Sequence, residues 1–377
     1  MSKKVIYLID ATAFCYRAFY ALKGLSTTYA QPTNAIYGFV NMLNKIMKEH
    51  KPQFLGVCFD VSRDTFRSRK FSAYKIQRPP MPDDLSSQMP FIKDIIKAYG
   101  LTILEKEGYE ADDIIAAVSG SALADGFEVL IVSSDKDMLQ LVKPGVKVLS
   151  PHKDEDIIYD EDKVFSCYGV KPSQIPDVIS LMGDSVDNIP SVPGIGEKTA
   201  VELIKRAGSV EKIIDEPELI KSEKIRSAVE RDTEKIKLNK ELAYLSADVK
   251  IDFDIEELKV RKQDAAELFK IFQKLEFKKF IQGLDLPDDK ESGSVDIKAI
   301  KDSQVPPIRD NLFLYGTCQE DAVFYADNSF FKVEHWLDNT KSMLADHKLK
   351  KISHDLKKTK VSFSRQGVKL AGFYFDT

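Results

Sequence analysis

Three apolar runs near the start of the chain each lead into acidic residues. Residues 5–10, 54–60 and 129–133 are continuous apolar segments, and the first two end in Asp10 and Asp60. Unbroken apolar runs, as opposed to alternating ones, are typical of strands that a parallel sheet buries on both faces. Amphipathic helical patterns lie between the runs, and this alternation predicts an open α/β sheet with helices on both faces.

The acids that follow these runs are expected to meet. The carboxyl ends of parallel strands lie along one edge of a sheet, and ligands bind outside that edge. A single acid at such a place is explained equally well by a strand that ends at the solvent. Acids at the start of a helix are likewise explained by their favourable interaction with the helix dipole. The whole set is larger than those explanations require, and it includes two pairs spaced three residues apart: Asp10, Asp60, Asp135, Asp137, Glu110 with Asp113, and Asp184 with Asp187.

Carboxylates at this density predict a metal site. They would repel one another and raise each other's pKa values, and divalent cations would relieve that cost. The five histidines and four cysteines form no cluster with ligand spacing, and ligation by oxygen alone favours Mg²⁺ or Mn²⁺ over zinc. So many acids indicate two or more ions, and two ions about 3.5–4 Å apart are the usual clamp for phosphodiester cleavage.

Charge distribution says more than net charge. The chain has 377 residues, enough for two or three domains, and its formal net charge is −4. Residues 63–78 hold six basic residues against one acid, whereas residues 110–137 hold seven acids against one lysine. Each block alone is compatible with a solvated helix face, but together they suit an anionic substrate beside a cation site.

Composition also bears on the compartment. No apolar run is long enough to span a bilayer, and the N-terminus shows no signal-peptide pattern. The four cysteines are scattered without a CxxC pair, which suits a reducing environment without a disulfide framework. We therefore expect a cytoplasmic protein with no membrane partner, acting as a monomer.

A glycine turn predicts contact with a nucleic-acid backbone. Gly194 and Gly196 flank an isoleucine between two helical segments, and Lys198 follows. Glycines let the backbone approach a phosphate, and the next helix offers free N–H groups. This is the helix-hairpin-helix pattern, although a tight helix–helix turn with no ligand gives the same spacing.

The basic segment predicts a second contact with DNA. It interleaves cations with aromatic rings, which suits single-stranded nucleic acid, and a proline-rich stretch then interrupts it. We interpret residues 63–90 as an arch over the sheet edge. The candidate DNA contacts outside the glycine turn are Arg17, Arg63, Arg67 and Tyr74.

Five ordered motifs resemble the 5′-nuclease domain of bacterial DNA polymerase I. They are "LIDATAFCYRAFYAL", "FDVSRDTFRSRKFSAYKIQRPPMPDDL", "GYEADDIIA", "SSDKDMLQL" and "LMGDSVDNIPSVPGIGEKTA". The resemblance covers roughly residues 3–285. It implies a PIN-like sheet domain followed by a helix-hairpin-helix subdomain, with removal of 5′ ends and flaps as the activity.

The resemblance also implies roles for individual residues. Lys75 and Arg78 match the arch lysine and arginine that steer the reacting phosphate. The substrates would be nicked or branched DNA with a 5′ end or flap, and RNA primer–DNA junctions, with K⁺ held at the helix-hairpin-helix. The acids that would hold metal ions are Asp10, Asp60, Glu110, Asp112, Asp113, Asp135, Asp137, Asp184 and Asp187.

The C-terminal part resembles a 3′→5′ exonuclease domain without its acids. An active domain of that family carries D-x-E on its first strand, whereas the comparable "LFLYGTC" has no acid, and "DLKKTK" has Thr359 where a metal-binding aspartate is expected. We interpret 310–377 as a partial and inactive domain that stops before its fold would close. No polymerase domain is present in these residues.

The predicted domains are 1–165 for the catalytic sheet, 166–285 for the helical subdomain, 286–309 for a linker and 310–377 for the partial domain. The leading hypothesis is a metal-dependent 5′→3′ exonuclease and flap endonuclease, as part or remnant of DNA polymerase I. One alternative is the N-terminal part of a complete polymerase. An alternative of another class is a branched-DNA-binding module with an inactive nuclease site.

Overall fold

The computed structural model divides into two compact units, Met1–Asp285 and Leu286–Thr377. Among the residues that it describes, no helix is both long and apolar enough to cross a membrane. The described residues are 4–152, 156–246, 249–251, 253–284, 297–305, 311–317, 321–326, 329–334, 338–353, 363–364 and 370–376.

The first unit is built on a six-stranded sheet in the order β3-β2-β1-β4-β5-β6. All neighbouring pairs are parallel except β5 with β6. Buried residues run without interruption along the central strands, which confirms the predicted open parallel sheet. The strands are β1 (Val5–Asp10), β2 (Phe54–Cys58), β3 (Thr102–Leu104), β4 (Glu128–Val132), β5 (Val146–Ser150) and β6 (Ile157–Tyr159).

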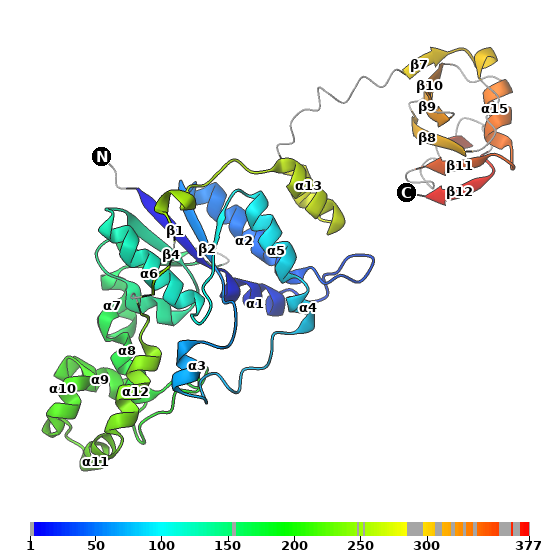
Figure 1. Cartoon of the computed structure of the whole chain (residues 1–377). Helices are drawn as coiled ribbons and strands as arrows, with labels where there is room; N and C mark the ends of the chain where they lie inside the picture. Colours follow the sequence, from blue (N-terminus) through cyan, green and yellow to red (C-terminus); the bar gives the residue numbers. More distant parts are fainter. Residues whose placement is uncertain are drawn as a thin grey trace. The chain divides into compact units, whose positions relative to one another are not determined.

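Helices cover both faces of this sheet (Figure 1). Successive side chains of a strand point to opposite faces, so Tyr7 and Ile9 pack with α2 and α5 while Ile6 and Leu8 pack with α6. Two short helices, α3 and α4, lie between β2 and α5 in the basic segment. The helices of this part are α1 (Ala11–Ala21), α2 (Asn34–His50), α3 (Phe66–Lys70), α4 (Asp83–Ser86), α5 (Met89–Ala98) and α6 (Ala111–Ala124).

A helical region follows the sheet and shares its core. The buried cluster on the α6 face continues through α8, α9 and α12. Three short 3₁₀ turns also belong to this region. η1 (Lys136–Leu141) precedes α7, η2 (Pro172–Gln174) lies between α7 and α8, and η3 (Pro217–Leu219) lies between α10 and α11. The helices are α7 (Glu161–Tyr168), α8 (Ile175–Met182), α9 (Glu197–Ala207), α10 (Val210–Asp215), α11 (Glu223–Arg231) and α12 (Thr233–Ala243).

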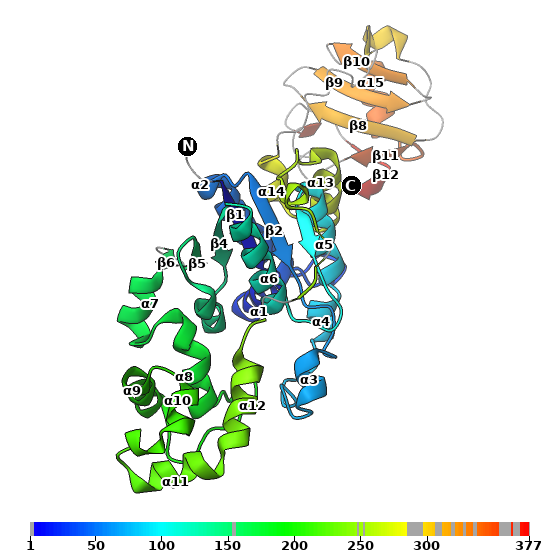
Figure 2. The same cartoon turned by 60° about the vertical axis from the view of Figure 1, so that its left-hand side comes forward.

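The chain then returns to the sheet. After the 3₁₀ turn η4 (Ile255–Leu258), helices α13 (Ala265–Lys274) and α14 (Lys278–Gln282) bury apolar residues in the cluster of α2 and α5. Figure 2 shows α13 beside α5. The prediction of one helical subdomain over 166–285 is therefore wrong for its last part, because α13 and α14 complete the core of the sheet domain.

The second unit has its own mixed sheet, in the order β12-β11-β8-β9-β10-β7. β7 pairs in parallel with β10, so the predicted linker 286–309 is wrong over 297–300, where the backbone joins the sheet. β8, the strand expected to lack an acid, is Asn311–Thr317; Thr359 lies outside the described residues. The other elements are β7 (Ile297–Ile300), η5 (Asp302–Gln304), β9 (Asp321–Ala326), β10 (Ser329–Glu334), α15 (Asp338–Ala345), β11 (Lys350–Ser353) and β12 (Phe373–Asp376).

Candidate active site

Asp10 links the ends of the two central strands. It is the last residue of β1 and 3% exposed, and its carboxylate accepts the N–H of Ala13 (3.3 Å) and the hydroxyl of Ser133 (2.8 Å), which directly follows β4. Burial raises the pKa of Asp10 to about 7, despite the opposing hydrogen bond from Ser133. The buried carboxyl therefore holds its proton more strongly than a carboxyl in water.

Asp60 brings the end of β2 to the same place. Its carboxylate accepts the N–H of Ala111 (2.7 Å), the first residue of α6, and its own N–H donates to the hydroxyl of Thr12 (3.0 Å). An acid at a helix N-terminus satisfies a free N–H group there. Asp60 thus joins the starts of α1 and α6 to the edge of the sheet.

The acids from separate segments share one electrostatic field. Burial, followed by the charges of Asp10 and Asp135, raises the pKa of Asp112 well above its usual range. Burial also raises the pKa of Asp137 to about 7, with contributions from Asp135 and from the acids of the 184–187 loop. Burial is the larger cause of both shifts, and the additional contributions from acids of other segments show that these carboxylates lie near one another. The structure therefore brings together acids that the strand pattern predicted to converge.

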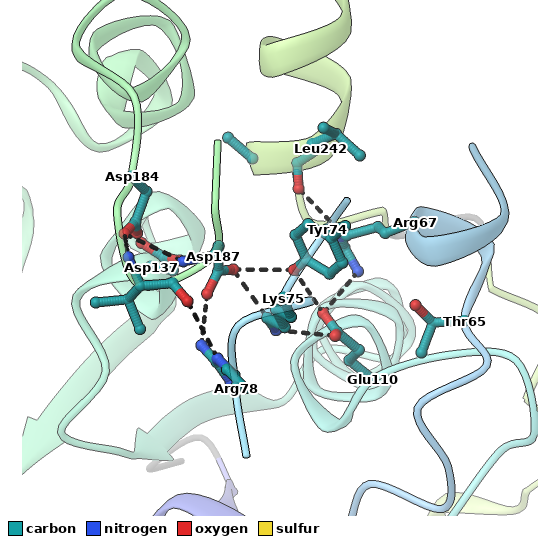
Figure 3. Close-up of polar contacts among 12 residues, drawn as sticks. Thr65, Arg67, Tyr74, Lys75, Arg78, Glu110, Asp137, Asp184, Asp187 and Leu242 are labelled. Carbon is teal, nitrogen blue, oxygen red and sulfur yellow. Dashed lines mark hydrogen bonds and ion pairs between the residues drawn. The ribbon is translucent and has the colours of Figure 1, made fainter. Parts of the chain in front are cut away.

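Asp187 connects this edge to the basic segment. It is 8% exposed and accepts the Tyr74 hydroxyl (2.9 Å), with the Lys75 ammonium 3.5 Å away and the Arg78 guanidinium also bonded (Figure 3). The Lys75 backbone N–H also donates to the Asp187 carbonyl (3.0 Å). Asp184 lies in the same loop, and its carboxylate accepts backbone N–H groups of that loop.

Lys75 lies between two acids of the site. Its Nζ is 2.8 Å from Glu110 Oε1, and its backbone adopts the left-handed region with φ of 52°. Burial alone would lower the pKa of Lys75, but Glu110 and Asp187 outweigh burial, so the pKa is raised. The lysine is therefore held as a cation at the sheet edge, on a backbone conformation that non-glycine residues rarely adopt.

Two predicted DNA contacts point inward instead. The Arg67 side chain is fully buried, and its guanidinium bonds both oxygens of Asp113 (2.6 and 2.8 Å). Tyr74 is 6% exposed, with its hydroxyl 3.0 Å from Glu110 Oε2. The interpretations of Arg67 as a phosphate contact and of Tyr74 as a base-stacking ring are wrong, because neither side chain reaches the surface. Asp113 is fully buried, and both of its carboxylate oxygens are bonded to Arg67.

The other predicted contacts are exposed. Arg17 donates to the hydroxyl of Ser134 (2.7 Å) and to the Pro151 carbonyl (3.0 Å), which places it beside the end of β4. Arg63 donates to the Pro79 carbonyl, and this hydrogen bond links two ends of the segment that contains α3. Both side chains can meet a phosphate near the acids.

The glycine turn is open on its outer side. Gly194 has φ of 86°, a conformation that favours glycine, and Gly196 is the N-cap of α9. A Cβ at either position would meet nothing within 4 Å, and Lys198 in the first turn of α9 is exposed. The first N–H groups of α9 are thus accessible to a phosphate.

Sequence reasoning missed Ser133 and Thr12. Ser133 is buried, donates to Asp10, and accepts the Asp135 N–H (3.0 Å). Ser133 directly follows β4 and Thr12 comes two residues after Asp10, and a hydroxyl at such a position is a signal that could have identified them. They hold the acids Asp10 and Asp60 in orientation.

A separate trio of ligand-type residues lies away from this edge. In the part of the chain that the structure describes, Glu49, His50 and Asp156 are the one group of three whose ligand atoms lie within 4.8 Å of one another. Asp156 is already paired with the Lys45 ammonium (2.7 Å) and with a backbone N–H. The acids of the sheet edge are more widely spaced, so their role as metal ligands stays a prediction.

The raised pKa values predict how stability depends on pH. For Asp10 and Asp137 the folded pKa is about 7, against about 3.9 in an unfolded chain. Between these values the folded state binds more protons, so the free energy of unfolding should fall as pH rises from about 4 to about 7. Thermal unfolding in a chelator across this range measures the slope, which Asp10→Asn should reduce and Asp162→Asn, an exposed residue of α7, should not. A slope that Asp10→Asn leaves unchanged would contradict the assignment.

Comparison with known protein families supports the fold of the first unit. The family model of the 5′-3′ exonuclease N-terminal resolvase-like domain matches residues 5–169, and that of the 5′-3′ exonuclease C-terminal SAM fold matches residues 170–266. The chain belongs to the 5′-3′ exonuclease family. It is therefore a nuclease of mixed α/β architecture, as the resemblance of its motifs implied.

Curated relatives of this nuclease fall into two sizes. It is 42% identical to a 5′-3′ exonuclease of Aquifex aeolicus (strain VF5) over 282 residues, 75% of this chain and 96% of the relative. It is 34% identical to DNA polymerase I of Bacillus caldotenax over 392 residues, 99% of this chain but 45% of the relative. The nuclease thus spans less than half of the polymerases that it matches.

Solved structures share the fold of this exonuclease at low identity. The T5 5′-exonuclease with divalent zinc ions bound has a TM-score of 0.55 and 21% identity, covering 73% of this chain and 99% of that one. The catalytic core of Rad2 in complex with DNA substrate has a TM-score of 0.51 and 17% identity, covering 73% and 88%. At these identities the likeness establishes the fold alone.

Proposed function

We propose that the first unit hydrolyses phosphodiester bonds at the 5′ ends and flaps of DNA, with divalent metal ions at the acidic edge of the sheet. One observation carries the proposal: burial, together with the charges of neighbouring acids, raises the pKa values of Asp10, Asp112 and Asp137 at one edge of the sheet. Such a set is costly alone, and bound cations lower that cost. Exonuclease family membership supports the reaction type.

The donor set fits hard divalent cations. The edge offers carboxylate oxygens without histidine or cysteine ligands, which favours Mg²⁺, with Mn²⁺ as a substitute. The residues that would hold the ions are Asp10, Asp60, Glu110, Asp112, Asp135, Asp137, Asp184 and Asp187. Divalent ions held there would supply Lewis-acid stabilisation of the charge that develops as the phosphodiester is cleaved. The related fold of T5 5′-exonuclease with divalent zinc ions supports a metal site.

Lys75 and Arg78 are proposed to act on the reacting phosphate. Both cations already lie at the edge through Asp187, and Lys75 also through Glu110. A fixed cation beside a phosphate stabilises the negative charge that builds up in the transition state. Their role would be to orient the scissile phosphate and to neutralise it.

Exposed groups of the helical region are proposed to hold the duplex. The Gly194–Gly196 turn, the N-terminus of α9 and Lys198 offer donors to a phosphate backbone, and K⁺ could share that backbone site. Arg17 and Arg63 would contact the strand that enters the acidic edge. T5 flap endonuclease in a complex with DNA and metal ions, a fold relative with a TM-score of 0.53, supports nicked or flapped DNA as the substrate. We also propose RNA primer–DNA junctions as substrates, and a monomer as the active form.

Lys198→Ala is expected to weaken duplex binding without changing the chemical step. Loss of one phosphate contact should reduce the slope of log affinity against log salt by about one. Fluorescence anisotropy with labelled nicked duplex over a salt series measures the slope. Lys147→Ala, an exposed residue of β5, is the control. An unchanged slope would remove α9 from the interface.

The decisive experiment uses a 5′-labelled flap substrate. The proposal expects product release that requires Mg²⁺ and stops with a chelator. Binding of the flap without cleavage at any Mg²⁺ or Mn²⁺ concentration would contradict the proposal and favour a non-catalytic DNA-binding module.

Truncation after Asp285 is expected to leave flap cleavage intact, because the acids and cations of the site belong to the first unit. The full chain should show no 3′→5′ exonuclease activity, since β8 carries no carboxylate to hold a metal ion. Cleavage rates of the two forms on 5′- and 3′-labelled duplexes measure both statements. A truncated protein that melts normally but has lost cleavage would make the second unit part of the nuclease.

A further inference from the structure

Arg67 is the largest fully buried side chain of the described residues, and all five of its donors are used. Its Nε donates to the Leu242 carbonyl (2.8 Å). One terminal nitrogen reaches Glu110 Oε2 (3.2 Å) and Asp113 Oδ2 (2.6 Å); the other reaches Asp113 Oδ1 (2.8 Å) and the Tyr244 carbonyl (2.9 Å). The five donors of an arginine have a fixed planar arrangement. Because all five are bonded, the guanidinium is held in a single position and orientation.

Three segments meet at this guanidinium. Arg67 lies in α3 and Asp113 in the first turn of α6. The two carbonyls lie at the end of α12, and Figure 3 shows the hydrogen bond from Arg67 to Leu242. Asp113 also accepts the backbone N–H of Glu110 (3.3 Å), which closes the capping box of α6. The arginine therefore fixes both the side chain and the backbone of Glu110.

Glu110 is the point where this buried network reaches the acidic edge. Its Oε2 accepts from Arg67 and from the Tyr74 hydroxyl, while its Oε1 pairs with Lys75. Loss of a group that orients a metal ligand typically lowers metal affinity about 10- to 100-fold. Asp113, with both oxygens on Arg67, supports Glu110 and is not itself available to an ion.

We propose that Arg67, held by Asp113, is a positioning residue that orients Glu110 for divalent metal binding. This inference rests on the proposed function, since it takes Glu110 as a metal ligand. A purely structural Arg67 would join α3, α6 and α12 and contribute to stability, but it would not affect metal affinity. The two roles therefore differ in a measurement made without DNA and without turnover.

Arg67→Lys provides the test, because lysine keeps the charge and loses the planar fork. Titration calorimetry with Mg²⁺ on the full chain should show affinity about 10- to 100-fold weaker than for the unsubstituted protein. Arg69→Lys is the matched control: this arginine lies in the same helix, is exposed and pairs with Asp64. Its Mg²⁺ affinity should stay within about twofold, because exposed ion pairs contribute little.

A double variant separates positioning from general damage. If Arg67 acts through Glu110, adding Arg67→Lys to Glu110→Gln should change Mg²⁺ affinity by less than about twofold, since the two effects are coupled. The inference would be overturned if the loss of Mg²⁺ affinity in the double variant equalled the product of the two single losses. Unchanged Mg²⁺ affinity in Arg67→Lys alone would also overturn it. If Arg67→Lys does not melt cooperatively, Asp113→Asn, which keeps the side-chain shape, is measured instead. It should weaken Mg²⁺ binding alone and add less than about twofold to Glu110→Gln.

A reference variant distinguishes failure of this inference from failure of the proposed metal site. Asp135→Asn should weaken Mg²⁺ binding whatever Arg67 does. Normal binding in both Asp135→Asn and Arg67→Lys would remove the metal site itself. Normal binding in Arg67→Lys alone would leave the site and remove only the positioning role.

Discussion

Asp135→Asn is expected to lower the single-turnover rate of flap cleavage at least about 100-fold, because metal ions contribute several kcal/mol to such reactions. Burial is the main cause of the raised pKa values of Asp10, Asp112 and Asp137, and the charge of Asp135 contributes to all three. Asp135 therefore lies close to three other acids of the set. Asparagine keeps the shape, removes the charge and can turn N–H donors toward a cation.

The measurement is made with enzyme in excess over a 5′-labelled flap, so that binding does not limit the rate. Flap affinity, measured with Ca²⁺ in place of Mg²⁺, should change little. Asp187→Asn is expected to show the same pattern, and Asp162→Asn is the exposed control. Near-normal turnover of both site variants at low Mg²⁺ would exclude these two residues from the metal site.

Lys75→Ala and Arg78→Ala should each reduce the rate of the chemical step about 100- to 1000-fold, the usual loss when one preorganised charge or donor is removed. Both cations already lie on the acidic edge, with the half-buried Lys75 between Glu110 and Asp187. Their partner in the reaction would be the phosphate that reacts, and not the duplex. Duplex affinity should therefore change far less than the rate.

Single-turnover rates and anisotropy on the same flap separate the two effects. Lys97→Ala, an exposed lysine of α5, is the matched control for loss of a positive charge. The predicted division of labour is between these arch cations and Lys198 at the duplex. If Lys75→Ala and Lys198→Ala lose binding and rate in equal proportion, that division is wrong.

Much of the catalytic edge could be predicted because its signals are local. Continuous apolar runs report strands buried on both faces, and the parallel direction of those strands follows from the helices between them. Once the strands are parallel, Asp10 and Asp60 must lie at the same edge. The glycine turn is local in the same sense, since φ of 86° at Gly194 is a property of that residue and its neighbours.

Charge and ring patterns were less reliable in the basic segment. Arg67 and Tyr74 lie in a segment with the composition of a nucleic-acid contact, and that segment also contains exposed residues such as Arg63 and Arg78. Arg67 and Tyr74 nevertheless point inward, because the carboxylates of α6 and of the 184–187 loop provide buried partners that strongly favour a cation or a hydroxyl. Nothing in the segment itself distinguishes an arginine that faces DNA from one that faces a buried aspartate.

The sequence by itself determined the parallel sheet, the acids at its edge, the helical region with its open glycine turn, and the family. Only the tertiary structure decided which of the predicted site residues are accessible to a ligand and which are bonded inside the protein. Arg67 meets the carbonyl of Leu242, 175 positions later in the chain. Likewise α13 and α14 return to cover the sheet from beyond the helical region. The physical reason is that strand direction and turn geometry follow from neighbouring residues, whereas burial and hydrogen-bond partners depend on segments that only the folded core brings together.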